Sequence, residues 1–377
     1  MKSRTHAAFT LVELVVSLAI ISMLALVLVA MTGQTSEVWG RARSKIDQFR
    51  GAREGFESMT RRLSQATLNT YLEYYNANGV TRNVQNSKSF EPKSYGRFSE
   101  LRFISGPNDK LLEGSTAPRP THGIFFQAPL GFVEDYEQFG ALDNLLNTWG
   151  YFVEFNSDVE SAPRFLRGQI SSGALPERKR YRLMELMQPS ETMLVYREAE
   201  SHKWFQLPVL ATTDRPVRPI ADNIVALVIL PRLAPNDTDP ADASGNTIVP
   251  EHALAPEFEY DSTTDGEGTV DAKAHLNTKH QLPPVVQVSM VAVDEASASR
   301  LADRFKNEPP DLKIDSPRQL FRKADQLKVP PSEGELSDLQ TLEKNLVDLK
   351  CNYRVFTTAV SLKGAKWSRT IPFRRPL

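Results

Sequence analysis

The chain has 377 residues, enough for one large domain or two ordinary ones, and 41% of them are hydrophobic and 24% charged. This composition is that of a globular protein, and a formal net charge of -1 gives no reason to expect a nucleic-acid partner. Because Cys351 is the only cysteine, the chain has no internal disulfide and no paired-cysteine metal or redox site.

The first element is an apolar segment, "AFTLVELVVSLAIISMLALVLVAM" at residues 8–31, with one carboxylate, Glu13. Residues 14–36 form a run of 23 without a charge. As a helix rising about 1.5 Å per residue, this run would cross the roughly 30 Å hydrocarbon core of a membrane. The alternative is a cleaved secretory signal preceded by Lys2 and Arg4, but the apolar core of such a signal is normally about 7–15 residues long. We therefore expect a membrane helix.

Beyond this segment, apolar residues recur at spacings of three and four. The positions are Trp39, Ala42, Ile46, Phe49, Arg53, Phe56, Thr60 and Leu63. This is the spacing of an a/d heptad, broken only at Arg53 and Thr60, and it predicts that the helix continues as far as residue 75. Since lipid cannot cover a helix of this length, we expect the apolar seam to pack on a domain of the same chain or on neighbouring copies.

After a polar loop, short segments in which apolar and polar residues alternate predict β-strands. The candidates are 98–105, 122–128, 149–156, 179–187, 192–198, 223–230, 285–293 and 353–362. Val286 and Val288 share one face of such a strand while Gln287 lies on the other, as in a half-exposed antiparallel sheet. The predicted fold class is α+β, with a long N-terminal hydrophobic helix packed on a mostly antiparallel β-sheet that carries large loop insertions.

Two long segments between the predicted strands are expected to be insertions in the sheet domain rather than separate domains. One is the acidic, proline-rich stretch 231–284, and the other is 295–350, with helices expected near 296–307 and 333–349. The predicted organisation is a leader at 1–8, a transmembrane and extended N-terminal helix at 9–75, and a β-rich globular domain at 76–377.

The first residues of the chain resemble the leader of type IV prepilins and pseudopilins. Lys2 and Arg4 precede Ala8, which is followed by the run "FTLVEL". The resemblance implies that a prepilin peptidase cuts between Ala8 and Phe9 and that Phe9 is then N-methylated. It makes Glu13 the fifth residue of the mature chain. The family usually has Gly before the cut, where this chain has Ala8.

The resemblance also gives Glu13 a role. On insertion scales an ionised carboxylate costs on the order of 2.5–3.5 kcal/mol at the centre of a membrane helix. In an assembly of such subunits, Glu13 of one copy would pair with the methylated amine of Phe9 in a neighbour, which compensates two buried charges and fixes the axial register. The alternative is that Glu13, four residues from the mature amine, lies at the membrane interface and is solvated.

The function implied by the resemblance is that of a structural subunit, a minor pilin or pseudopilin, in a type IV pilus-like or type II secretion-like fibre. Its partners would be the prepilin peptidase, other pilin-like subunits through the N-terminal helix, and the membrane. The resemblance implies a single-pass inner-membrane protein with its C-terminal domain in the periplasm or on the cell surface. Basic residues flank both ends of the apolar segment, so the charges alone leave the topology open. The alternative function is a membrane-anchored ligand-binding or adhesin protein with the same anchor.

A narrower resemblance is carried by the chain length and by the stretch "WGYFVEF" at 149–155. Both are similar to the Verru_Chthon cassette protein C family, whose members are large prepilin-type proteins.

The sequence contains no GxSxG, HExxH, P-loop or GxGxxG motif, and we therefore expect a protein that is not an enzyme. His275 and His280 lie in a polar stretch and are expected to be solvated rather than metal ligands. Cys351, beside an apolar strand, is expected to be a small buried hydrophobic residue.

One stretch, "DSTTDGEGTVDA", offers a candidate calcium site. Asp261, Asp265 and Asp271 occupy positions 1, 5 and 11 of a spacing like that of an EF-hand loop. The twelfth position, where a bidentate Glu is needed, is Ala272. This departure favours a solvated loop, so we expect no cofactor and keep calcium as the alternative.

Overall fold

The computed structural model divides the chain into two compact units, Met1–Arg50 and Gly51–Leu377, which are described separately. The residues that the structure describes are 11–12, 14–26, 28, 49–83, 85–114, 117–142, 144–159, 162–175, 177–198, 200, 202–212, 214–233, 254–264, 278–305, 308–314, 320–332 and 334–364.

In the first unit, residues 14–26 are helical. Their large apolar side chains are between 52% and 72% exposed. The hydroxyl of Ser17 donates to the carbonyl oxygen of Leu14 at 2.9 Å, and that of Ser22 to the carbonyl oxygen of Leu18 at 2.8 Å. Both hydroxyls are thus satisfied within the helix itself. Of the helices in the described part of the chain, none is both long and apolar enough to cross a membrane.

Helix α2 (Arg50–Leu63), which belongs to the second unit from Gly51 onward, has one buried face. The residues of that face are Ala52, Gly55, Phe56, Met59 and Leu63. Arg53 is exposed and Thr60 is half-buried, so the predicted seam is rotated relative to the real one. The helix buries Ala52 and Met59 instead, because these positions complete an apolar stripe without an internal charge.

The predicted helical limit at residue 75 is wrong. Helix α2 ends at Leu63, and Tyr71–Tyr75 forms strand β1, which pairs with β2 (Ser94–Phe98) in a two-stranded antiparallel ribbon. The sequence of β1, "YLEYY", is rich in aromatic residues, which favour a pleated strand with cross-strand ring contacts. The heptad pattern itself stops at Leu63, so the extension to residue 75 had no periodic support.

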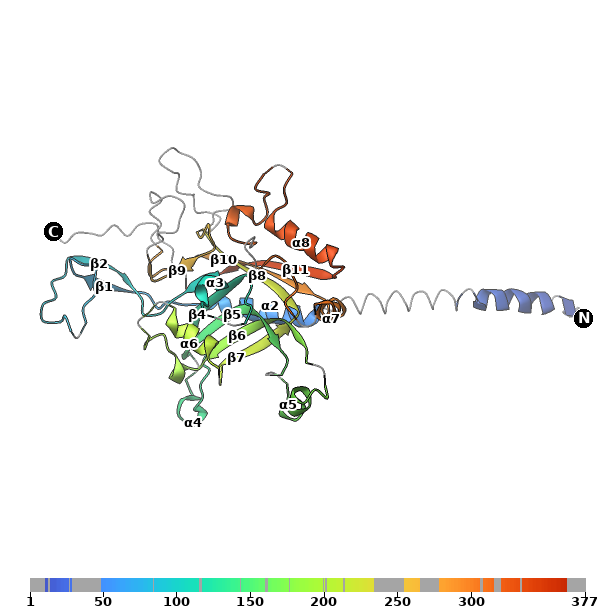
Figure 1. The fold of residues 1–377 in the computed structure, drawn as a ribbon, viewed down its shortest axis with the longest axis horizontal. Helices are drawn as coiled ribbons and strands as arrows, with labels where there is room; N and C mark the ends of the chain where they lie inside the picture. Colours follow the sequence, from blue (N-terminus) through green and yellow to red (C-terminus); the bar gives the residue numbers. More distant parts are fainter. Residues whose placement is uncertain are drawn as a thin grey trace, which may run out of the picture. The chain divides into compact units, whose positions relative to one another are not determined.

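Two antiparallel sheets form the body of this unit (Figure 1). The strands of the first sheet, in spatial order, are β7 (Val217–Asp222), β6 (Lys179–Gln188), β5 (Leu146–Ser157), β4 (His122–Pro129), β3 (Ile104–Pro107) and β9 (Tyr260–Asp261). Those of the second are β11 (Tyr353–Ser361), β10 (Val285–Val293) and β8 (Ile224–Arg232). Strands β4, β5, β8 and β10 are almost wholly buried and supply most of the core. The α+β class with antiparallel sheets is confirmed.

Short helices connect or cover the strands. They are α3 (Asn108–Leu111), α4 (Tyr136–Phe139), α5 (Arg164–Ser171), α6 (Lys203–Leu210), α7 (Glu295–Arg304) and α8 (Asp338–Asp348), with 3-10 turns η1 (Ser190–Thr192) and η3 (Ala324–Gln326). Helix α8 begins with a capping box in which Ser337 and Gln340 satisfy each other's backbone amides. Helices α7 and α8 confirm the two predicted helices within 295–350.

Six predicted strands correspond to β4, β5, β6, β8, β10 and β11, and two predictions fail. The predicted strand 98–105 is not one strand: its first residue ends β2, its last two begin β3, and residues 99–103 lie between them, where the Ser99 hydroxyl accepts from the backbone amide of Leu101 at 3.1 Å and turns the chain. Residues 192–198 contain local turns, in which the amide of Arg197 donates to the carbonyl of Leu194. Part of the stretch 231–284 belongs to the first sheet, since Tyr260–Asp261 pairs with β3.

Candidate functional site

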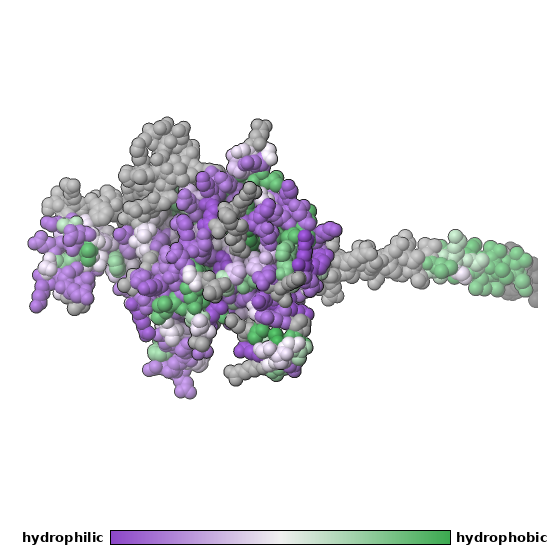
Figure 2. All heavy atoms as spheres, viewed as in Figure 1, coloured by the Kyte–Doolittle hydropathy of each residue, from purple (hydrophilic) through white to green (hydrophobic). Residues whose placement is uncertain are grey.

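The residues predicted for processing and assembly, Ala8, Phe9 and Glu13, lie outside the described residues. The part of their segment that is described, at residues 11–28, exposes a nearly continuous apolar surface. Figure 2 colours the described residues of this segment as mostly hydrophobic and the exterior of the globular unit as mostly hydrophilic. Apolar surface of this extent is characteristic of a segment that meets a membrane or another protein.

A buried ionic cluster lies where α2 meets the six-stranded sheet. Its centre is Glu185 on β6, whose side chain is 0% exposed. Arg62, from the last turn of α2, donates to one carboxylate oxygen, and Tyr151 on β5 donates to the same oxygen at 2.9 Å. Arg218 on β7 donates to the other oxygen at 2.7 and 2.9 Å. We call these four residues the Glu185 cluster.

The Glu185 cluster fixes the end of α2 to three strands at once. The guanidinium carbon of Arg62 also lies 4.5 Å from the centroid of the Trp149 ring, so its charge is held on an aromatic face as well as by the carboxylate. Burial and the neighbouring carboxylate raise the pKa of Tyr151, which keeps its phenol protonated as a donor. Charge-assisted bonds in such a buried setting are strong and depend on both partners being present.

Helix α2 also contacts both sheets along its length. A Cβ atom placed on Gly55 would lie 2.9 Å from the Cβ of Ala221 on β7, so this close approach requires glycine. On the other side the rings of Phe56 and Phe356 on β11 have centroids 5.8 Å apart. The start of the globular unit is therefore anchored between β7 and β11 by packing and at its end by the Glu185 cluster.

A second buried carboxylate, Glu154 on β5, is held without any contribution from α2. Arg119 donates to it at 2.7 Å and Arg215 at 2.9 Å. Burial opposes ionisation of Glu154, but the bonds from Arg215 and Arg119 outweigh it and hold the pKa of the carboxyl below its usual value. This group ties β5 to the segments that precede β4 and β7.

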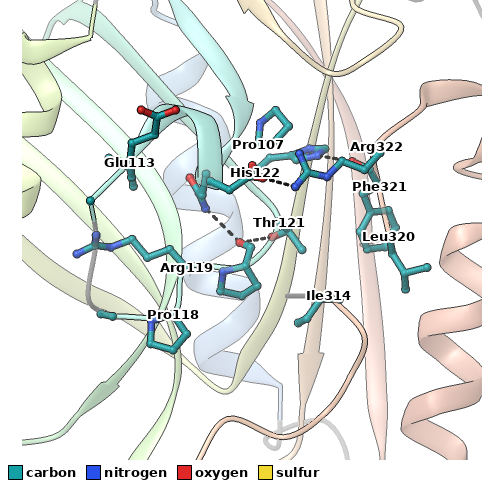
Figure 3. A pocket seen from close by; sticks show the side chains of 16 residues that line it. Pro107, Glu113, Pro118, Arg119, Thr121, His122, Ile314, Leu320, Phe321 and Arg322 are labelled. Carbon is teal, nitrogen blue, oxygen red and sulfur yellow. Dashed lines mark hydrogen bonds and ion pairs between the residues drawn. The ribbon is translucent and has the colours of Figure 1, made fainter. Parts of the chain in front are cut away.

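A cavity of about 410 Å³ lies between α3, the start of β4 and residues 320–322 (Figure 3). Arg119 lines it, and so do Arg322 and Asp109, which form an ion pair with each other. His122 is fully buried at its inner wall, where its Nε2 hydrogen bonds to the carbonyl oxygen of Phe321 at 2.9 Å. Arg119, His122 and Arg322 are thus bonded to other parts of the fold, whereas the buried side-chain oxygen of Asn108, which also lines the cavity, has no hydrogen-bond partner among the described residues.

His122 has a structural task. Its Nδ1 accepts from the backbone amide of Ile229 at 3.1 Å, and next to it the hydroxyl of Thr121 accepts from the amide of Leu227 at 3.0 Å. These two side chains satisfy amides on the edge of β8 that is not paired with β10, since β8 is the end strand of the second sheet. Burial lowers the pKa of His122 to about 4, so the ring is neutral at pH 7, with the hydrogen on Nε2 assigned from its bond to Phe321.

The candidate calcium residues are only partly described. Asp261 is present in β9, where its carboxylate accepts from the amide and hydroxyl of Thr263 at 2.8 and 2.7 Å. Asp265 and Asp271 lie outside the described residues. Within the described part of the chain, no group of three or more His, Cys, Asp or Glu side chains is arranged to hold a metal ion.

The prediction of a solvated His280 is wrong, and His275 lies outside the described residues. The ring of His280 is buried, accepts from the backbone amide of Ser99 at 3.2 Å, and packs on Phe98 with centroids 5.0 Å apart. Cys351 is buried, as predicted, and burial raises the pKa of its thiol.

Sequence reasoning missed the Glu185 cluster, although β6 carries a signal for it. Tyr181, Leu183 and Met187 lie on the same face of that strand, and Glu185 interrupts this otherwise apolar row. A lone acid on a core-facing row predicts a buried partner of opposite charge. The sequence could not identify Arg62 as that partner.

The comparison with family models gives one match. Residues 3–29 match the prokaryotic N-terminal methylation motif, and the match includes none of the globular unit. No curated protein and no solved structure matches the chain. The motif indicates a pilin-like protein that is processed by a prepilin peptidase and takes part in pilin assembly, and it suggests a structural subunit that is membrane-anchored or surface-exposed.

Proposed function

We propose that this protein is a minor pilin or pseudopilin, a structural subunit of a type IV pilus-like or type II secretion-like fibre. The observation that carries the proposal is the methylation motif at residues 3–29. The apolar segment holds the subunit in the inner membrane before assembly, with the globular unit in the periplasm or on the cell surface. Membership of the narrower Verru_Chthon cassette protein C family is proposed on the chain length and the stretch at 149–155 alone.

Processing begins the mature chain at Phe9. The prepilin peptidase cuts after Ala8, which removes Lys2 and Arg4, and Phe9 is then N-methylated. In the assembled fibre the carboxylate of Glu13 pairs with the Phe9 amine of a neighbouring copy. Each charge compensates the other in apolar surroundings, so the pairing also selects the axial register of the helices.

The globular unit carries loops and a two-stranded ribbon that extend beyond the two-sheet body (Figure 1) and are available for contacts with other subunits. The Glu185 cluster supports the same function mechanically, because it ties the last turn of α2 to β5, β6 and β7. A pull on the N-terminal segment would then be carried by the sheet rather than by a loop.

Two measurements test the proposal. Intact-mass analysis of the protein extracted from membranes should show a mature chain that starts with N-methylated Phe9. Crosslinking in native membranes should join N-terminal segments of two subunits near Glu13. Glu13→Gln should lose these crosslinks while membrane retention persists, whereas Glu13→Asp, which keeps the charge, should retain most of them.

A mature chain that starts beyond residue 25 would contradict the prepilin assignment. A parent protein that inserts but shows no contact between N-terminal segments, and that binds a soluble ligand alone, would instead support the adhesin or receptor alternative.

A further inference from the structure

The two-stranded ribbon of β1 and β2, with its connecting residues, is an arm that spans residues 71–98. No third strand pairs with it among the described residues. Its exposed apolar side chains include Leu72 and Val80, and exposed Tyr74 and Tyr95 have ring centroids 5.0 Å apart. An isolated two-stranded ribbon is marginally stable in water, and large exposed aromatic residues are enriched at protein interfaces. The arm therefore has the character of a contact surface that lacks its partner.

The end of the arm is basic. Residues 76–93 contain Arg82, Lys88 and Lys93 and a single acid, Glu91, which gives a net charge of +2. All four charged side chains are exposed. Glu91 lies 3.9 Å from Lys93, so the positive charge is concentrated at Arg82 and Lys88.

A second projection of the globular unit has the opposite charge. The α4 loop, residues 132–142, contains Glu134, Asp135 and Glu137 and no basic residue, for a net charge of -3. Tyr136, at the centre of these acids, is 78% exposed, and Phe132 is exposed beside them. The loop is ordered by Asp135, whose carboxylate caps α4 by accepting from the amide of Gln138. It presents a fixed aromatic residue surrounded by carboxylates.

We infer that the basic arm of one copy binds the acidic α4 loop of another copy of this chain. The charges are complementary, and each surface offers exposed apolar side chains that the contact would cover. Figure 1 draws the arm and the α4 loop as separate projections of the globular unit. A contact between two different surfaces of identical subunits is heterologous and generates an open chain of copies when its rotation does not close. The inference rests on the proposed function, since a fibre brings copies side by side.

The natural side chains allow a direct test in the full-length protein in membranes. Unlabelled and ¹⁵N-labelled protein are mixed and treated with a carbodiimide, which joins an amine to a carboxylate without a spacer. Peptides that join Lys88 or Lys93 of one isotope to the α4 loop of the other are expected. Combined Arg82→Glu and Lys88→Glu should reduce the mixed links made by Lys93, whose amine this variant retains, at least about tenfold, because like charges then face each other.

Charge reversal on the other surface completes the test. Glu134→Lys with Glu137→Lys should cause a similar loss of the links between Lys93 and Asp135, both of which are retained, and mixing the arm variant with the loop variant should restore these links. Lys344→Glu, an exposed lysine on α8, is the matched control and should leave the yield unchanged. Links confined to one isotope, or a yield that reversal does not lower, would overturn the inference.

The same digest separates this inference from the proposed function. If crosslinks between N-terminal segments near Glu13 are present and arm links are absent, the arm contact is wrong and the fibre assignment stands. If both kinds of link are absent from the parent protein, both are wrong.

Discussion

The helical segment at residues 14–26 and helix α2 differ in where their apolar side chains lie. In the first, large apolar side chains point outward on all sides and the two serine hydroxyls bond back to the helix. In the second, apolar burial is limited to one stripe, and Arg62 finds a carboxylate on the sheet. A helix that is apolar all round needs apolar surroundings from outside its chain, whereas an amphipathic helix is satisfied by its own domain. The four predictions below test this difference, from the largest effect to the smallest.

The largest effect is expected from Glu185→Ala. This change removes the carboxylate that Arg62 and Arg218 share. Arg218 is 58% exposed and can be solvated, but Arg62 is only 21% exposed, and breaking a buried ion pair by removing one partner costs about 3–5 kcal/mol. Denaturant unfolding of the full-length protein in detergent measures the loss. Glu57→Ala is the control on the outer face of α2, where the ion pair with Arg53 is exposed and no change is expected. Equal stability of the two variants would show that the Glu185 cluster does not hold α2.

Phe56→Ala should reduce the free energy of unfolding by about 3 kcal/mol, because a buried ring is removed from between α2 and β11. Leu18→Ala is the matched change in the N-terminal segment. Its side chain is 55% exposed, so the melting temperature of the globular unit should stay the same. The comparison fails if the two variants lower that temperature equally.

Acidification should weaken the globular unit through His122. The pKa of this buried ring is about 4 in the folded state, and the ordinary value of 6.5 applies in the unfolded chain. At a pH between 4 and 6.5 the unfolded chain therefore binds a proton at His122 that the folded chain does not bind. Stability is therefore lost as the pH falls from 6.5 towards 4, with about 2 kcal/mol gone at pH 5.

Unfolding curves at several pH values measure the His122 contribution. The variant His122→Gln should show a smaller loss of stability over this window. An identical pH dependence in both proteins would contradict a neutral, buried His122. Helix content in residues 14–26 should not change over the same range, since the described residues there carry no titratable side chain.

The smallest effect is expected from Ser17→Ala. Its hydroxyl is bonded only within its own helix, so the change should alter membrane retention by less than about 1 kcal/mol and leave unfolding of the globular unit unchanged. Resistance of the membrane-bound protein to carbonate extraction measures retention. A large loss of retention would show that Ser17 has a partner outside its helix.

The sequence predicted those helices, strands and motifs whose residue pattern is contained in one short stretch of the chain. The apolar character of the N-terminal segment is uniform along the chain, and the methylation motif at 3–29 is readable without a fold. Strand β10 coincides with the predicted 285–293, because apolar residues occupy every second position from Val286 to Ala292. Strands β7 and β9 were not predicted, because neither has a run of alternating apolar residues long enough to indicate a strand. Strand β7 contains Pro219, which only an edge strand tolerates, and β9 has two residues.

The tertiary structure determined which residues far apart in the sequence bond to each other. Arg62 and Glu185 are 123 residues apart, and His122 reaches the amide of Ile229 across 107 residues. Periodicity shows which face of a helix or strand is apolar, but a buried charge or an edge amide can be satisfied by any element that packs against it. The heptad therefore indicated a packed face on α2, while only the folded sheet determined that Arg62, in the last turn of the helix, lies beside the carboxylate of Glu185.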